Sequence, residues 1–173
     1  MTSVARPRIR AGVCGMGFIG PAHVEALRRV EGVDVVAIST REPGRGRAVA
    51  ERFGVPRVYD AHEALVDDPS IDVVHICTGN RLHAPLVRRA VAAGKHVICE
   101  KPLATSLEEA RDLQRLAADS RGVYAVNYQY RYYPMIQQAR WMVRQGALGR
   151  LRVIHGHYIQ DWLSRPTDYN WRV

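Results

Sequence analysis

The sequence predicts an α/β fold of the Rossmann type, in which helices cover both faces of a doubly wound parallel sheet. Apolar, β-branched runs alternate along the chain with segments of helical periodicity, which is typical of βαβ units. The runs are apolar throughout, as in strands that are buried on both faces. A glycine-rich loop, Gly15-Met-Gly-Phe-Ile-Gly20, stands between the first run and the first helical segment.

The boundaries of several predicted elements carry start or stop signals. Gly54 and Gly94 are placed to end helices, and Ser106-Leu-Glu-Glu109 matches a capping box at the start of another. The predicted strands cover residues 9–14, 33–38, 72–77, 96–99 and 123–126, with a short one beginning at residue 58. One helix follows the glycine-rich loop, and the others cover residues 44–52, 61–66, 84–93 and 106–118.

The character of the sequence changes after about residue 127. Tyrosines gather over residues 128–133, a helix is predicted over residues 134–145, and residues 151–159 alternate partly as a strand does. We expect residues 1–126 to form the Rossmann domain. Residues 127–173 are expected to be the truncated beginning of a second α/β domain, for substrate binding and oligomerisation.

The composition indicates the cellular compartment of the protein. The chain of 173 residues has no apolar run long enough to cross a membrane, and its basic N-terminus lacks the apolar core of a signal peptide. Cys14, Cys77 and Cys99 are odd in number and lie in or beside apolar runs, as buried thiols in a reducing compartment do. We expect a cytoplasmic protein that does not bind membranes.

The net charge of +8 raises the question of nucleic acid. Only two of the 25 basic residues are lysines, and the arginines are spread over predicted helices instead of forming one basic segment. This pattern favours a solvated surface, and we expect no nucleic-acid partner. Weak binding of polyanions remains the alternative.

The glycine-rich loop is the first candidate site. Gly15 allows a tight turn, Gly17 allows the backbone to approach a pyrophosphate, and Gly20 allows the helix to pack close to the strand. The N-terminus of the helix adds free N–H groups and a partial positive charge. The alternative is a loop without a ligand. We assign to the cofactor Gly15, Gly17, Phe18, Ile19 and Gly20.

The end of the second strand addresses the choice of dinucleotide. NAD-specific enzymes usually have a carboxylate about twenty residues beyond the glycines, to accept from the ribose 2′-hydroxyl. Here the sequence is Ser39-Thr40-Arg41, and Glu42 is the first carboxylate. Hydroxyls beside a guanidinium suit a 2′-phosphate, so we expect NADP to be preferred over NAD. Alternatively, Arg41 stacks on adenine and both cofactors are accepted.

Lys101 is the candidate for chemistry. Three loops leave the carboxyl ends of predicted strands, where ligands of open parallel sheets bind: the glycine-rich loop, residues 78–83 and Glu100-Lys-Pro102. A lysine buried beside a positively charged nicotinamide is expected to have a lowered pKa, so it can exchange a proton with a substrate hydroxyl. A surface lysine is the alternative.

Four motifs together resemble one family. They are Gly15-Met-Gly-Phe-Ile-Gly20 with His23, Thr78-Gly-Asn-Arg-Leu-His83, Glu100-Lys-Pro102 and Asn127-Tyr-Gln-Tyr-Arg131. In this order they are similar to the N-terminal part of the Gfo/Idh/MocA oxidoreductases, and the similarity covers essentially the whole chain. The resemblance implies a Rossmann domain, a second α/β domain, and hydride transfer between NAD(P) and a carbinol carbon of a sugar, cyclitol or related polyol.

The resemblance also implies roles for single residues. Lys101 is then the catalytic lysine, and Glu100 lines the nicotinamide pocket. Thr78, Asn80 and His83 contact or shape the cofactor site, while Asn127 lies where nicotinamide and substrate meet. Arg131 and Trp162 are implied to bind substrate, although packing is as good an account of the tryptophan. The stretch from residue 160 to Trp171 also resembles a part of some members.

One departure from the family concerns the second domain, which supplies an Asp and a His that this chain lacks. Asp168 has no histidine after it, and His155 and His157 come too early. With no third ligand, His155 and His157 predict no metal site.

The alternative function is therefore a non-catalytic dinucleotide-binding protein, either a sensor or a subunit of a split enzyme. For the full-length protein we expect a homo-oligomer. For this chain alone we expect self-association, through an open edge of the strand at residues 151–159.

Overall fold

The structure is a computed structural model that describes residues 7–169. Trp171 and most of the basic N-terminal stretch lie outside these residues. The chain divides between Gln129 and Tyr130 into two compact units.

The first unit is built on a sheet of six parallel strands in the order β3-β2-β1-β4-β5-β6. This is the doubly wound order of dinucleotide-binding folds, which confirms the predicted fold class. The strands are β1 (Ile9–Cys14), β2 (Val33–Ser39), β3 (Arg57–Tyr59), β4 (Val73–Ile76), β5 (His96–Glu100) and β6 (Tyr124–Asn127). The helices are α1 (Gly20–Leu27), α2 (Pro43–Phe53), α3 (His62–Asp67), α4 (His83–Ala92) and α5 (Leu107–Ala118).

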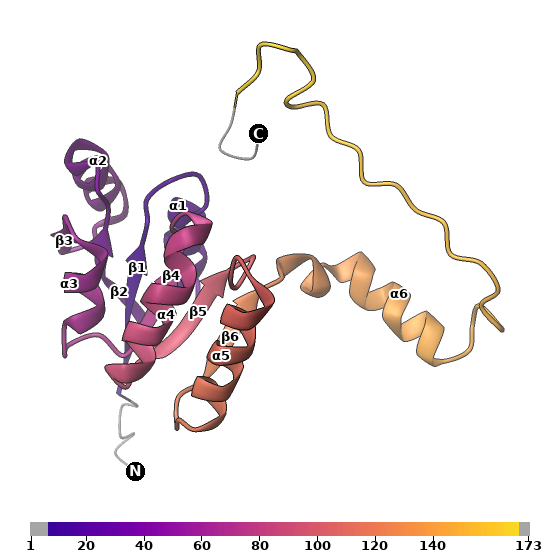
Figure 1. Cartoon of the computed structure of the whole chain (residues 1–173), viewed down its shortest axis with the longest axis horizontal. Helices are drawn as coiled ribbons and strands as arrows, with labels where there is room; N and C mark the ends of the chain where they lie inside the picture. The colour runs from indigo at the N-terminus through magenta and orange to yellow at the C-terminus, as the bar shows by residue number, and fades with distance from the viewer. Residues whose placement is uncertain (1–6, 170–173) are drawn as a thin grey trace. The chain divides into compact units, whose positions relative to one another are not determined.

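Helices lie on both faces of this sheet. In Figure 1, α4 lies in front of the central strands and α1 lies behind them. Neighbouring residues of a strand serve opposite faces: Cys14 belongs to the buried cluster with Leu86 and Val87 of α4, whereas Val13 belongs to the cluster with Val24 of α1. Because the central strands β1 and β4 bury both of their faces, their apolar runs are continuous rather than alternating.

The predicted boundary signals act as expected. Gly54 ends α2 with φ 66° in the left-handed region, where glycine has no steric penalty. Ser106 caps α5, since its hydroxyl accepts a hydrogen bond from the backbone N–H of Glu109 at 3.1 Å. The carboxylate of Glu109 reaches back to the N–H of Thr105, one residue before the cap. The short 3₁₀ turn η1 (Asn80–Leu82) directly before α4 was not predicted.

Strand order places one crevice at the centre of the sheet. From β1 the chain crosses to β2 on one side, and β4 lies on the other side of β1. The loops that leave the carboxyl ends of β1 and β4 therefore diverge at this point, which is where open α/β sheets bind ligands. These two loops are the glycine-rich loop and the loop of Thr78.

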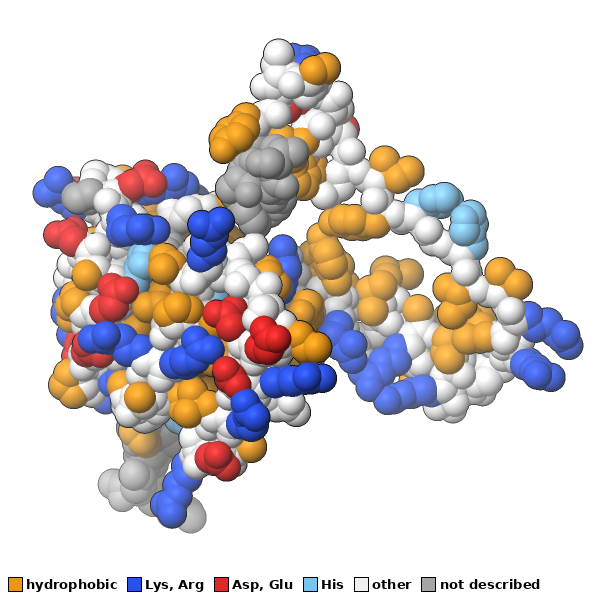
Figure 2. Space-filling model, in the orientation of Figure 1, with side chains coloured by type: hydrophobic (Ala, Val, Ile, Leu, Met, Phe, Trp, Pro, Cys, Tyr) orange, Lys and Arg blue, Asp and Glu red, His pale blue; other side chains and the backbone are white. Residues whose placement is uncertain are grey.

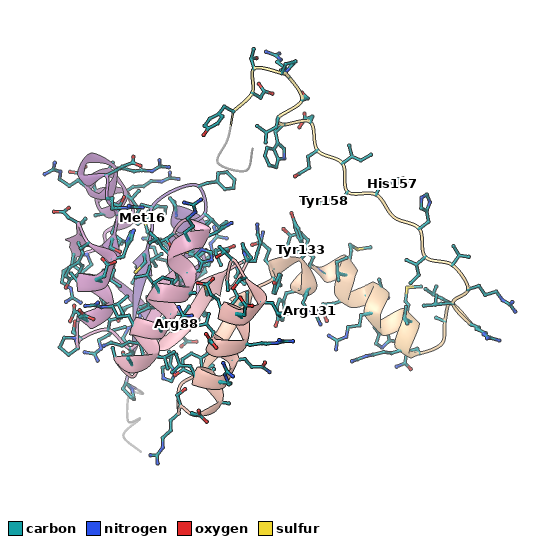
Figure 3. All side chains as sticks on the ribbon, in the orientation of Figure 1. Met16, Arg88, Arg131, Tyr133, His157 and Tyr158 are labelled. Carbon is teal, nitrogen blue, oxygen red and sulfur yellow. The ribbon has the colours of Figure 1, made fainter. Side chains whose placement is uncertain are left out.

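The second unit corrects one prediction. It holds α6 (Pro134–Arg144), as expected, but residues 151–161 have no regular secondary structure, so the predicted strand over residues 151–159 is wrong. A strand needs a neighbour for its backbone N–H and C=O groups, and among the described residues this segment has none. Figure 3 marks His157 and Tyr158 on this extended segment.

The surface of the first unit mixes charges. Over α4 and α5, Figure 2 shows blue and red side chains side by side, and Arg89 pairs with Asp67 at 2.5 Å while Arg88 and Arg115 both approach Asp112. Within residues 7–169, no helix has the length and apolar character needed to cross a membrane.

Candidate functional site

Two glycines of the glycine-rich loop are required by the fold itself. Gly15 has φ 92°, and a Cβ added there would lie 2.7 Å from the carbonyl oxygen of Cys77 at the end of β4. A Cβ on Gly20 would lie 1.9 Å from the carbonyl oxygen of Gly15. The loop therefore turns tightly against β4 and lets α1 begin close to β1.

At Gly17, by contrast, no contact within the described chain requires a glycine. Its φ lies outside the left-handed region, and a Cβ placed on it would meet no atom of the described chain within 4 Å. The residue is exposed at the tip of the loop. A glycine here leaves the backbone bare toward the crevice, which is what a closely approaching ligand requires.

Hydrogen-bond donors surround this bare backbone. Among the described residues, the N–H groups of Gly17, Phe18 and Ile19 have no acceptor, and α1 begins without a side-chain cap. The first turn of α1 contains no acidic residue. Phe18 is 97% exposed, so its ring covers none of these donors. Free amides and a positive helix end suit a pyrophosphate.

At the end of β2, two of the three predicted 2′-phosphate residues are engaged inside the chain. Ser39 is fully buried, and its hydroxyl lies 2.9 Å from Nδ1 of His62. The hydroxyl of Thr40 accepts from the N–H of Glu42 at 3.1 Å. Arg41 is the one of the three whose side chain is exposed. Ser39 and Thr40 thus shape the turn that presents Arg41.

Arg45 is a residue that the sequence argument missed. It lies in the first turn of α2, and its guanidinium donates to the carbonyl oxygen of Gly17 at 3.1 Å. This contact ties the end of β2 to the glycine-rich loop and adds a second exposed cation near Arg41 in sequence. No local pattern in the sequence marks it, because its partner Gly17 lies 28 positions away.

The loop after β4 is fastened to the loop after β5. His83 is buried, with Nδ1 at 2.6 Å from the carbonyl oxygen of Pro102 and Nε2 at 3.0 Å from that of Thr78. A neutral imidazole donates from one nitrogen at a time, and the shorter contact favours Nδ1. His83 is therefore a buried side chain that connects the two loops. Thr78 and Asn80 are half-buried on the loop after β4.

Glu100 ends β5 as a buried carboxylate with several donors. Oε1 accepts from Nδ2 of Asn127 at 2.5 Å and lies 3.0 Å from Nε2 of His23, while Oε2 accepts from the N–H of Lys101. Burial raises the pKa of this carboxyl, but hydrogen bonds from His23 and Asn127 outweigh it and the net pKa is lowered. Glu100 is thus held as a carboxylate.

Lys101 follows directly, and its side chain is exposed. The burial expected for it is therefore not provided by the described chain alone. The Lys101–Pro102 peptide bond is cis. The position at the carboxyl end of β5 agrees with the expected crevice, since β4 and β5 are adjacent.

His75 was also missed by the sequence argument. It lies on β4, is 5% exposed, and its Nδ1 is 3.0 Å from Nδ1 of His23. Burial, and then the nearby His23, lower the pKa of His75 to about 4. Both histidines line a groove of about 420 Å³ between α1 and the sheet, which Ile98 and Asn127 also line.

The remaining predicted residues belong to the second unit. Arg131 lies in the turn η2 (Gln129–Tyr132), and Trp162 is 44% exposed in the segment without regular structure. His155 and His157 stack edge to face at 4.6 Å. Within the described part of the chain, no group of three or more His, Cys, Asp or Glu could hold a metal ion.

The site thus combines free amides at the glycine-rich loop, cations at the end of β2, and a carboxylate next to a lysine at the end of β5. The amides can hold phosphates, and the cations can hold a further phosphate. The lysine can exchange a proton with a bound hydroxyl. These groups follow the order in which a dinucleotide presents its parts across a doubly wound sheet.

Known proteins are similar to this chain. A family model described as "Oxidoreductase family, NAD-binding Rossmann fold" matches residues 9–128. Levoglucosan dehydrogenase of Pseudarthrobacter phenanthrenivorans is 35% identical over 95% of this chain and 44% of that protein. The 1,5-anhydro-D-fructose reductase of Ensifer adhaerens is also 35% identical, over 91% of this chain and 50% of that protein.

A solved structure of levoglucosan dehydrogenase in complex with NADH superposes with a TM-score of 0.89 at 34% identity. The superposition covers 95% of this chain and 47% of that one. The chain therefore spans about half the length of the curated relatives it matches.

Proposed function

The chain belongs to the Gfo/Idh/MocA family of oxidoreductases, whose NAD-binding Rossmann part its residues 9–128 match. From this premise we propose that the chain holds NAD(P) in an enzyme that transfers a hydride to or from a carbinol carbon of a sugar, cyclitol or related polyol. Gly17 carries the proposal, because nothing in the described chain explains a glycine there and a pyrophosphate does.

Sugar-like substrates are supported by the relatives. The names of two of them specify a dehydrogenase of levoglucosan and a reductase of 1,5-anhydro-D-fructose. The chain spans about half of their length. We therefore propose, for the whole protein, a dehydrogenase or reductase activity on a sugar-like substrate.

The cofactor, when bound, supplies the acceptor or donor of the hydride. We assign the matching proton transfer to Nζ of Lys101, at the carboxyl end of β5. Glu100 and Asn127 line the nicotinamide end of the site, and Thr78, Asn80 and His83 shape the loop beside it. Arg131 and Trp162 are proposed to bind substrate.

Binding of the cofactor is tested directly with the chain. NADH and NADPH are titrated into it, and the fluorescence of the reduced nicotinamide is followed, with displacement by the oxidised cofactors as a check on specificity. We expect saturable, displaceable binding. No saturable binding of either cofactor to a folded chain would refute the proposal.

NADP is proposed as the preferred cofactor. Arg41 and Arg45 are exposed cations at the end of β2 and in the first turn of α2, and no carboxylate precedes Glu42 in this turn. Glu42 itself lies beside Arg45, at 4.0 Å. A guanidinium beside the ribose discriminates in favour of a 2′-phosphate.

We expect Arg41→Ala to weaken NADPH binding about fivefold while NADH binding changes little, since an exposed charge-assisted contact contributes about 1 kcal/mol. Arg47→Ala is the matched control, because Arg47 is an exposed arginine of α2 and, among the described residues, Arg45 rather than Arg47 donates to the glycine-rich loop. An unchanged ratio of the two affinities in Arg41→Ala would contradict the preference.

The setting and assembly follow from the same proposal. Cys14, Cys77 and Cys99 are buried free thiols, which supports a reducing, cytoplasmic compartment. We propose that residues from about 127 onward begin the second domain, and that the whole protein is a homo-oligomer.

A further inference from the structure

Three buried side chains from three elements form one line of contacts. His75 of β4 faces His23 of α1 through the two Nδ1 atoms at 3.0 Å, and Nε2 of His23 faces Oε1 of Glu100 of β5 at 3.0 Å. Each of the three residues is at most 8% exposed. The rings of the two histidines meet edge to face, with centroids 5.3 Å apart.

The proton positions along this line are fixed by counting donors. Glu100 is a carboxylate that can only accept, so its contact with Nε2 of His23 is a hydrogen bond only if Nε2 carries a hydrogen. When His23 is neutral with its hydrogen on Nε2, its Nδ1 carries a lone pair and can only accept. The contact between the two Nδ1 atoms is a hydrogen bond only if His75 carries its hydrogen on Nδ1 and donates it.

One added proton reverses the direction of the hydrogen bond between the two Nδ1 atoms. A proton that binds Nε2 of His75 allows the Nδ1 hydrogen of His75 to pass to Nδ1 of His23. His23 is then an imidazolium that donates to both neighbours, and His75 is neutral again with its hydrogen on Nε2. The bond broken at His75 Nδ1 is matched by the one formed at His23 Nδ1, so the added proton has moved by one ring.

The groove supplies the entry point for that proton. His75 lines the groove between α1 and the sheet, and among the described residues its Nε2 has no hydrogen-bond partner. The other groups facing the line are Asn127 of β6 and Cys77 after β4. Nδ2 of Asn127 donates to Oε1 of Glu100 at 2.5 Å and lies 3.2 Å from Nε2 of His23. Burial, and then the charge of Glu100, raise the pKa of the Cys77 thiol, so it remains neutral.

We propose that His75 and His23 form a proton relay from the groove to Glu100, in which His75 is a positioning residue that sets the tautomer of His23. The relay keeps the carboxylate of Glu100 in place. When a proton enters, His23 becomes an imidazolium, so the carboxylate gains a positively charged neighbour. Its link to the nicotinamide rests on the proposed function, which puts Glu100 at that end of the cofactor.

The relay is tested on the cofactor-free chain by ¹⁵N NMR of the imidazole nitrogens. At neutral pH we expect a protonated Nδ1 in His75 and a protonated Nε2 in His23. On acidification we expect His23 to become an imidazolium while His75 stays neutral and changes its protonated nitrogen from Nδ1 to Nε2. A protonated Nε2 in both neutral histidines, or an imidazolium at His75 in that first step, would overturn the proposal.

Two variants separate the relay from simple packing. Asn in place of His75 can still donate to or accept from Nδ1 of His23, whereas Leu fills the space without doing either. We expect the acid step of the pair to move down by about one pH unit in His75→Leu, since the imidazolium loses a charge-assisted partner, and to stay nearly in place in His75→Asn. Equal steps in the two folded variants would overturn the proposal.

A parallel titration with NADH keeps the two proposals apart. If the NMR pattern is as expected and NADH does not bind, the proposed function fails and the relay stands. If NADH binds and both histidines are Nε2-protonated at neutral pH, the relay fails and the proposed function stands.

Discussion

His75 illustrates how a single buried side chain ties stability to pH. Its pKa is lowered from the ordinary 6.5 to about 4, first by burial and then by His23. A group whose pKa is lowered on folding stabilises the fold fully above its ordinary pKa, and this contribution is lost as the pH falls through the folded value.

We therefore expect the free energy of unfolding to drop by about 3 kcal/mol between pH 6.5 and pH 4 because of His75. The measurement is urea denaturation at several pH values for the wild type and His75→Asn, which cannot take up the proton. Equal losses in the two proteins over this range would contradict the assignment.

Residues that act through close neighbours in sequence could be predicted, and residues that act through distant partners could not. Gly15, Gly17 and Gly20 lie in one loop, and the order strand, loop, helix already indicates their use. His75 meets a partner that lies 52 positions away in the sequence. Nothing in the apolar run around His75 distinguishes it from a histidine that merely fills the core. The burial of Ser39 was equally hidden, because it depends on His62 in another element.

Among the elements, β1 and β4 are joined at their amino ends by one residue. Asp72 precedes β4, and its carboxylate accepts from the backbone N–H of Arg10 at 2.8 Å and from its guanidinium at 3.0 and 2.7 Å. These bonds fix the register of the two strands whose opposite ends form the crevice. The hydrogen bonds of Arg10 lower the pKa of Asp72 to about 2.

We expect Asp72→Asn to lower the free energy of unfolding at pH 7 by about 1 kcal/mol, because the pair is partly exposed. Since the pKa of Asp72 is lowered on folding, its contribution is present above pH 3.8 and is lost as the pH falls toward 2. Asp34→Asn is the control: the Arg8–Asp34 pair is more exposed and should contribute less. A larger loss in Asp34→Asn, by denaturant titration, would contradict this ranking.

The strand error shows what sequence patterns leave out at the level of elements. Every element of the first unit was predicted except η1. Strands buried between two helix layers are recognisable in the sequence as continuous apolar runs. Residues 151–159 have a partial alternation but no neighbouring strand among the described residues. A strand is defined by its pairing, and pairing is not a property of its own sequence.

At the scale of the whole molecule, apolar side chains are divided unevenly. The first unit buries most of its large apolar residues in two clusters, whereas Val153, Ile154 and Ile159 of the second unit are each more than 80% exposed. Ile136 and Trp141 of α6 are at least half exposed. Surfaces of this kind associate with one another in water.

We expect the 173-residue chain to self-associate with rising concentration, through exposed side chains and not through a strand edge as the sequence suggested. Light scattering across a concentration series is the measurement. Replacing Ile154 and Ile159 together by Ser should reduce the association, and replacing Val123 by Ser, which is exposed in the first unit, is the control. A wild type that stays monomeric throughout would contradict the expectation.

On the proposed function, position 17 is a glycine because a dinucleotide approaches the backbone there. The most direct measurement compares NADH and NADPH binding with thermal unfolding in Gly17→Ala and Gly20→Ala. A methyl group on Gly17 meets nothing in the chain, so we expect a stability change within about 0.5 kcal/mol and at least about a tenfold loss of affinity for both cofactors. Gly20→Ala should instead destabilise the fold, because its Cβ would lie 1.9 Å from a backbone oxygen. Undiminished cofactor affinity in a folded Gly17→Ala protein would contradict the account.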